Sequence, residues 1–128
     1  MIDYDKALKA NKKIAKLDEK IRSGKGGFKD VHDLAAETGK IAADVIEENI
    51  SERYPDGNVS DDEIRAIVSP ILRKNHEYVT ELGAAIINKQ YQDIGVGLKA
   101  TIPKYDLYRE TGIVWKITNE RRKNNNGL

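Results

Sequence analysis

The sequence predicts a mainly α-helical protein with three to four amphipathic helices in one compact bundle. The chain has 128 residues, 39% apolar and 34% charged, which is enough for one modest core and too little for two domains. Apolar residues recur at three- and four-residue steps over long stretches. Aromatic residues make up only 6% of the chain, fewer than strand-rich domains usually carry. We therefore expect a single helical domain over residues 1–119 and a disordered polar tail over 120–128.

The first two helices are expected on either side of a glycine-rich connection. The first covers residues 3–23, because Asp3 can cap its start and Gly24 can end it. The second covers residues 28–52. Gly39 lies inside it, where glycine costs about 1 kcal/mol relative to alanine, so we expect this residue to mark a close helix crossing.

A tight reversal is expected at Tyr54-Pro55-Asp56-Gly57, because proline presets its own φ and glycine tolerates the left-handed conformation. Ser60 and Glu63 then have the spacing of a capping box, in which a hydroxyl and a carboxylate satisfy the free amides at a helix start. A third helix over 61–91 should follow, kinked at Pro70 where a backbone donor is missing.

The pattern changes towards the C-terminus. Residues 96–102 alternate between apolar and polar side chains, as a short half-buried strand does. Residues 113–118 are rich in β-branched side chains and could pair with that strand in a short β-hairpin. Residues 106–119 also fit a fourth helix with one apolar side, and local composition leaves both interpretations open.

The formal charge of +1 is unevenly distributed along the chain. Residues 1–30 carry a net +4, 31–63 a net −8, 64–102 a net +2 and 103–128 a net +3. This pattern favours multipolar protein contacts over duplex binding, which usually needs one basic face. The acidic quarter contains a set of carboxylates that could imitate the phosphates of a nucleic acid: Asp33, Glu37, Asp44, Glu47, Glu48 and Glu52.

No motif predicts catalysis, a cofactor or a metal site. The chain lacks cysteine, which excludes disulfides and thiolate zinc sites. Residues 23–27 depart from the spacing of a phosphate-binding loop, and residues 95–100 do not lead from a strand into a helix as the dinucleotide fingerprint requires. His32 and His76 are isolated. No apolar run approaches the roughly 18 residues of a membrane span, so we also expect no membrane association.

Recognition of another protein is the expected mode of action. Direct nucleic-acid binding is not favoured, because the basic run Arg121-Arg122-Lys123 has no interleaved aromatic platform. Aromatic side chains commonly dominate the binding energy of protein interfaces. Tyr105, Tyr108 and Trp115 are therefore the candidate partner-binding residues.

Several local features recur in a fixed order along nearly the whole chain. They are Tyr4 to Leu8, the connection Ile21 to Gly26 with the helix start Asp30-Val31, the turn Tyr54 to Gly57, the stretch Ile71 to Asn75, and Ile94 to Ala100 with Pro103 and Arg109. In this order they resemble the N-terminal region of minor head structural proteins from tailed phages and prophages of Gram-positive bacteria.

The resemblance implies a helical, non-enzymatic module that contacts portal or capsid components, in the virion or in the host bacterial cytoplasm. Members of that family typically continue into a C-terminal region with cysteines, whereas this chain has none. The family supplies no catalytic residue to carry over. The alternative hypothesis is a small phage-encoded inhibitor of a host nuclease defence, of the anti-CRISPR type, whose acidic face would bind the nuclease.

Overall fold

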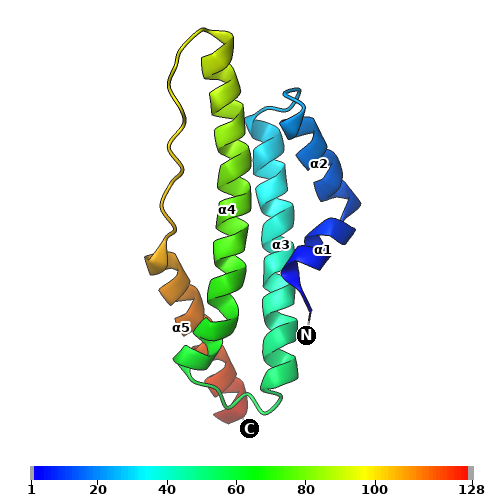
Figure 1. Cartoon of the computed structure of the whole chain (residues 1–128). Helices are drawn as coiled ribbons and strands as arrows, with labels where there is room; N and C mark the ends of the chain where they lie inside the picture. The colour runs from blue at the N-terminus through cyan, green and yellow to red at the C-terminus, as the bar shows by residue number, and fades with distance from the viewer. Residues whose placement is uncertain (1, 127–128) are drawn as a thin grey trace.

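Two long antiparallel helices form the centre of the molecule, and shorter helices lie on both sides of them (Figure 1). The computed structural model describes residues 2–126. Its helices are α1 (Tyr4–Ala10), α2 (Lys12–Arg22), α3 (Phe28–Arg53), α4 (Asp61–Asp93) and α5 (Leu107–Asn126). α1 and α2 lie along α3, α2 also contacts α4, and α5 packs on the opposite side of α4. The mainly helical class is confirmed, whereas the expected count of three to four helices is wrong.

The N-terminal segment is two helices because Asn11 interrupts it. The backbone of Asn11 is extended, and its amide donates to the carbonyl oxygen of Leu8 at 3.1 Å, which closes α1. Its side-chain Oδ1 accepts from the amide of Ile14 at 3.0 Å, which caps α2. The expected caps at both ends of this region are present: Asp3 Oδ1 accepts from the amide of Asp5, and Gly24 follows α2 with a φ of 81°.

The turn between α3 and α4 and the start of α4 agree with the local signals. Gly57 has a φ of 70°, and its amide donates to the carbonyl oxygen of Tyr54 at 3.0 Å. Ser60 Oγ accepts from the amide of Glu63, and Glu63 Oε1 accepts from the amide of Ser60, both at 3.2 Å. The hydrogen bonds that the amide and the hydroxyl of Ser60 donate to Glu63 Oε1 lower the pKa of Glu63 below its ordinary value. α4 continues through Pro70 as one helix.

The expectation that Gly39 marks a close helix crossing is wrong. A Cβ atom at this position would meet no atom within 4 Å. Gly39 instead lines a cavity of about 270 Å³ together with Ala35 of α3, Leu72 of α4 and residues that precede or begin α5. The glycine therefore leaves space between the helices.

The core consists of two clusters along the α3–α4 pair. The cluster near the turn contains α3 and α4 side chains such as Ile50 and Ile64, and both Tyr4 and Val114 of α5 join it. The cluster further from the turn is formed by Ile14, Ile21, Leu34, Leu82 and Ile86. α1 and α5 thus pack on one half of the central pair, and α2 packs on the other.

The C-terminal region is where the structure differs most from the sequence-based expectation. Within residues 2–126 there is no strand, so the short β-hairpin is wrong and 106–119 belongs almost entirely to a helix. Glu110, Val114 and Thr118 are buried at four-residue steps, which is the period of a helix face. The helix also continues through 120–126, part of the expected disordered tail, while residues 127 and 128 lie outside the described residues.

Candidate partner-binding surface

Exposed apolar side chains are concentrated in one part of the chain. Nine large hydrophobic residues are exposed among those that the structure describes, and seven of them lie between residues 94 and 115. These seven, which we call the apolar band, are Ile94, Val96, Leu98, Ile102, Leu107, Tyr108 and Trp115. Concentrated exposed apolar surface is typical of protein interaction sites. The band follows the segment beside α4 and continues on to α5 (Figure 1).

Two aromatic residues of the band share one face of α5. Tyr108 is 91% exposed and Trp115 is 61% exposed. They are seven residues apart, about two helical turns, so their side chains leave the helix in nearly the same direction. Gly112 lies between them, and a Cβ atom there would meet nothing within 4 Å. We call Tyr108 and Trp115, with the gap at Gly112, the aromatic stripe.

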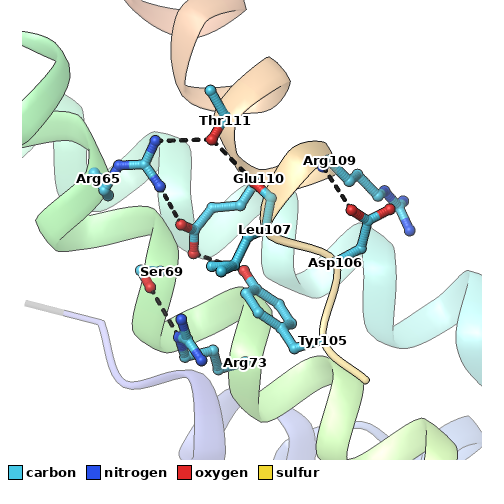
Figure 2. Close-up of polar contacts among 9 residues, drawn as sticks. All are labelled: Arg65, Ser69, Arg73, Tyr105, Asp106, Leu107, Arg109, Glu110 and Thr111. Atoms are coloured by element: carbon cyan, nitrogen blue, oxygen red, sulfur yellow. Dashed lines mark hydrogen bonds and ion pairs between the residues drawn. The ribbon is translucent and has the colours of Figure 1, made fainter. Parts of the chain in front are cut away.

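A buried carboxylate fixes the start of α5 on α4. Glu110 is only 1% exposed, and it forms an ion pair with Arg65 of α4. Its other carboxylate oxygen accepts a hydrogen bond from the hydroxyl of Tyr105 at 2.7 Å. Figure 2 shows these side chains converging between the two helices. A buried charge is stable only when it is paired and hydrogen-bonded, and Glu110 meets both conditions.

Further contacts extend this arrangement. The guanidinium of Arg73 lies 4.5 Å from the ring centroid of Tyr105, and its Nε donates to Ser69 Oγ at 3.2 Å. Arg65 Nη2 donates to Thr111 Oγ1 at 3.0 Å. We call the six residues that make these contacts the clasp: Arg65, Ser69, Arg73, Tyr105, Glu110 and Thr111.

The clasp favours the ionised form of its carboxylate. Burial alone raises the pKa of Glu110, but hydrogen bonds from Ser69 and Tyr105 and the charge of Arg65 outweigh burial and hold that pKa below its ordinary value. Burial, together with the hydrogen bond to Glu110, raises the pKa of Tyr105. At neutral pH the clasp therefore contains a carboxylate and a neutral phenol.

The three predicted anchor residues have different surroundings. Tyr108 and Trp115 lie on the surface, whereas Tyr105 is half-buried with its hydroxyl bonded to Glu110 and its ring beneath Arg73. His76 also packs against the ring of Tyr105 in an edge arrangement, with centroids 5.7 Å apart. Tyr105 therefore takes part in the attachment of α5, whereas both residues of the aromatic stripe are exposed.

The predicted acidic residues all belong to α3. Asp33, Glu37, Asp44 and Glu48 fall within about 60° of one another around the helix, at 100° per residue; we call these four the acidic stripe. It is partly neutralised, because Glu37 lies 3.1 Å from Lys13 of α2 and 3.7 Å from Lys40.

Glu47 lies just outside the acidic stripe, about 40° from Asp33 around the helix. Its Oε1 lies 2.6 Å from Arg121 Nη2, which ties α3 to α5. This contact makes Glu47 part of the internal attachment of α5, in addition to the clasp at the other end of that helix. Glu52, the remaining member of the predicted acidic set, lies in the last turn of α3.

A further cavity lies where α1 and α2 meet α4. Its volume is about 470 Å³, and in its lining the hydroxyl of Tyr78 donates to Asp18 at 2.5 Å. No group of three or more potential metal ligands occurs within residues 2–126. No helix in that part of the chain is long and apolar enough to cross a membrane.

Sequence reasoning missed the clasp. Its central pair joins residues 65 and 110, which are 45 positions apart, and no local pattern connects them. One signal was available: Glu110 falls on the same helical face as Val114 and Thr118, so an acid occupies an apolar stripe. Such a carboxylate requires a cation from a neighbouring helix.

Comparison of the chain with protein families, with curated proteins and with solved structures finds no significant match.

Proposed function

We propose that this chain is a non-enzymatic structural module of a tailed phage or prophage head, which binds a portal or capsid protein through the aromatic stripe. The observation that carries the proposal is the concentration of seven exposed apolar residues between 94 and 115. Exposed aromatic residues at the centre of such a surface provide most of the binding energy in many interfaces. The module would act in the virion or in the host bacterial cytoplasm.

The charges around the aromatic stripe indicate the kind of surface that fits it. Arg109 and Lys116 are exposed on α5 beside Tyr108 and Trp115, and the carboxylate of Glu110 is buried in the clasp. The exposed charged residues next to the stripe in sequence are therefore basic. A partner surface with an apolar centre and acidic residues around it would be complementary.

The buried carboxylate supports a structural role over a catalytic one. Glu110 is bonded to Arg65 and Tyr105, and both partners stabilise its ionised form. A general acid or base at neutral pH needs a pKa close to 7 and access to a substrate. The pKa of Glu110 is held below its ordinary value, so this carboxylate does not meet the first condition.

The second candidate function is inhibition of a host defence nuclease of the anti-CRISPR type. The observation that favours it is the alignment of four carboxylates in the acidic stripe of α3. The ion pairs of Glu37 with Lys13 and Lys40 count against it, because they neutralise one position and place lysines beside the stripe. We therefore rank this function below the head module.

Binding measurements with purified portal and capsid proteins of tailed phages, and with a nuclease of host defence, would test the proposal. We expect Trp115→Ala to weaken binding to a head protein at least tenfold, and we expect little loss when salt is raised. Phe28→Ala is the matched control, because Phe28 is an exposed aromatic residue outside the apolar band.

Charge reversal of Asp44 and Glu48 to lysine tests the second function in the same assay. Glu47 is left unchanged because its reversal would break the contact with Arg121. Binding to the nuclease that is lost on this reversal and falls steeply with salt would favour the inhibitor. Equal binding by Trp115→Ala and the unmodified chain, with circular dichroism showing both folded, would contradict the head module.

A further inference from the structure

Residues 94–106 run alongside α4 in the opposite direction and are attached to it on one side only (Figure 1). The amide of Val96 donates to the carbonyl oxygen of Tyr91 at 2.8 Å. The amide of Ala100 donates to Asn88 Oδ1 at 2.6 Å. Further along, His76 Nε2 donates to the carbonyl oxygen of Pro103 at 2.7 Å. These contacts keep the segment open and elongated against the helix.

The opposite edge of this segment carries unpaired backbone groups. In an extended chain, successive amides point to alternate edges. Ala100 directs its amide to Asn88 of α4, so Lys99 and Thr101 on either side, and Gly97 by the same alternation, direct theirs outward. Within residues 2–126 these three amides have no backbone partner. An edge of this kind is a template for an added strand.

We propose that the occupant of this edge is a second copy of the chain, paired antiparallel about a twofold axis at Leu98. In this register Val96 faces Ala100 of the other copy, and Leu98 faces its own equivalent on the axis. The outward amides of Gly97 and Lys99 then form a reciprocal hydrogen-bonded pair, as an antiparallel ladder requires. This dimer goes beyond the proposed function, because it requires no phage component.

Two neighbouring registers are less favourable. After a shift by one residue, each outward-pointing amide would face a residue of the other copy whose own amide points to α4. The same shift would place apolar side chains opposite polar ones. The register centred on Lys99 places two lysine side chains directly opposite each other, which is destabilising. With Leu98 on the axis, Lys99 faces Gly97, Val96 faces Ala100 and the two Leu98 side chains face each other.

Charge complementarity supports the same arrangement. The last turn of α4 contains no basic residue, although the carbonyl groups at a helix C-terminus favour a cation, and its Asp93 forms an exposed ion pair with Lys89 at 3.6 Å. Antiparallel pairing carries Lys104 of one copy towards this end of α4 in the other. The twofold arrangement also closes on itself, since α4 covers the inner edge of each segment.

Sedimentation analysis of the full chain tests the proposal. We expect a reversible monomer–dimer equilibrium between low micromolar and millimolar concentration, because a single strand pair buries less surface than a standard stable interface. Lys99→Pro removes an outward amide, so this variant should remain monomeric with unchanged helical circular dichroism. A monomeric unmodified chain over the whole range would overturn the proposal.

The position of the axis has its own test. Leu98→Lys and Leu98→Glu should each be monomeric alone, because like charges would meet on the axis. An equimolar mixture of the two variants should form a heterodimer, because opposite charges then meet. A dimer that persists in both variants alone, or no heterodimer on mixing, would overturn this register.

A matched variant separates this proposal from the binding of a head protein. Tyr108→Lys alters the aromatic stripe and leaves residues 94–102 unchanged, so we expect it to dimerise normally while binding to a head protein falls. Loss of dimerisation in this variant would mean that the stripe, and not the extended segment, joins the two copies.

Discussion

The α3–α4 pair and α5 are held in place by different kinds of contact. The central pair buries Leu34, Ile50, Ile64 and Leu82 completely, and these side chains are all apolar. α5 buries Val114 between two polar side chains, Glu110 and Thr118. Apolar burial does not depend on ionisation, whereas the clasp requires a charged carboxylate. α5 is therefore the region whose attachment should respond to pH and to single polar substitutions.

The largest expected loss of stability comes from a substitution in the apolar core of the α3–α4 pair. Leu34→Ala should lower the free energy of unfolding by about 2 to 5 kcal/mol, because it removes buried methyl groups and leaves a cavity. Urea melts followed by circular dichroism measure the loss. Leu107→Ala is the matched control, since Leu107 is 56% exposed and a surface change of this kind usually costs less than about 0.5 kcal/mol. Similar losses in both variants would contradict our assignment of the core.

A substitution in the clasp should loosen α5 and leave the rest of the chain largely unchanged. Glu110→Gln should destabilise the attachment of α5 by about 2 kcal/mol, less than the loss of a partner from a fully buried pair, because solvent reaches Arg65. Hydrogen exchange should accelerate in α5 and change little in α3. Glu120→Gln is the control, because Glu120 is exposed on the same helix. Uniform acceleration through all helices would show that α5 is not a separate unit.

Acidification should release α5 through the same group. The pKa of Glu110 in the folded chain lies below its ordinary value of 4.5. The ionised form therefore stabilises the folded chain above that value, and the stabilisation is lost as pH falls through the lowered pKa. Trp115 is the only tryptophan and lies on α5, so its fluorescence anisotropy reports this region. We expect the anisotropy to fall in acid.

Other carboxylates also titrate in this range, so the acid experiment needs a comparison. The pKa values of Asp30, Glu37 and Glu63 are lowered by hydrogen bonds to Gly27, Lys13 and Ser60. These residues lie in α3 and near the start of α4. Glu110→Gln retains all three, so it should lose only the acid-dependent change that comes from the clasp. An unchanged acid response in this variant would assign the transition to the other carboxylates.

The parts of the fold that could be predicted from the sequence depend on neighbours along the chain. The reversal at Gly57 and the capping box of Ser60 and Glu63 involve residues within three positions of each other. The break at Asn11 is also local, and an asparagine three residues before Ile14 is a recognisable cap that our reading passed over. Local hydrogen bonds can be inferred from spacing alone.

The parts of the fold that could not be predicted depend on contacts between residues that are far apart in the sequence. Alternation over 96–102 is present, but a strand also needs a partner, and the expected partner 113–118 is helical. Gly39 faces a cavity, which helix propensity cannot reveal. In the candidate site, residue type alone suggested Tyr105, Tyr108 and Trp115, whereas the inward position of Tyr105 depends on Arg73 and Glu110.

Removing a helix cap should have a smaller effect, and it allows α4 and α5 to be compared directly. Ser60→Ala should lower the free energy of unfolding by about 1 kcal/mol, because it leaves the amide of Glu63 without a partner at the start of α4. Asp106 caps α5 by accepting from the amide of Arg109 at 3.0 Å. Asp106→Ala should therefore raise hydrogen exchange in α5 and leave the urea midpoint of the central pair nearly unchanged. Equal shifts of that midpoint would indicate one cooperative unit.

The smallest expected effect is a gain in stability from replacing a helical glycine. We expect this gain to affect the whole chain when the glycine is in the central pair, and α5 alone when it is in α5. Gly39 and Gly112 both lie inside helices, and an added Cβ atom would meet nothing within 4 Å at either position. Alanine should therefore stabilise each helix by about 0.5 to 1 kcal/mol through its higher helix propensity. Gly39→Ala should raise the urea midpoint of the whole chain, because α3 belongs to the central pair. Gly112→Ala should slow hydrogen exchange in α5 alone, and it would also fill the gap between Tyr108 and Trp115. If Gly112→Ala raised the global midpoint as much as Gly39→Ala, α5 would have to unfold together with the core, and the clasp would be an integral part of the fold.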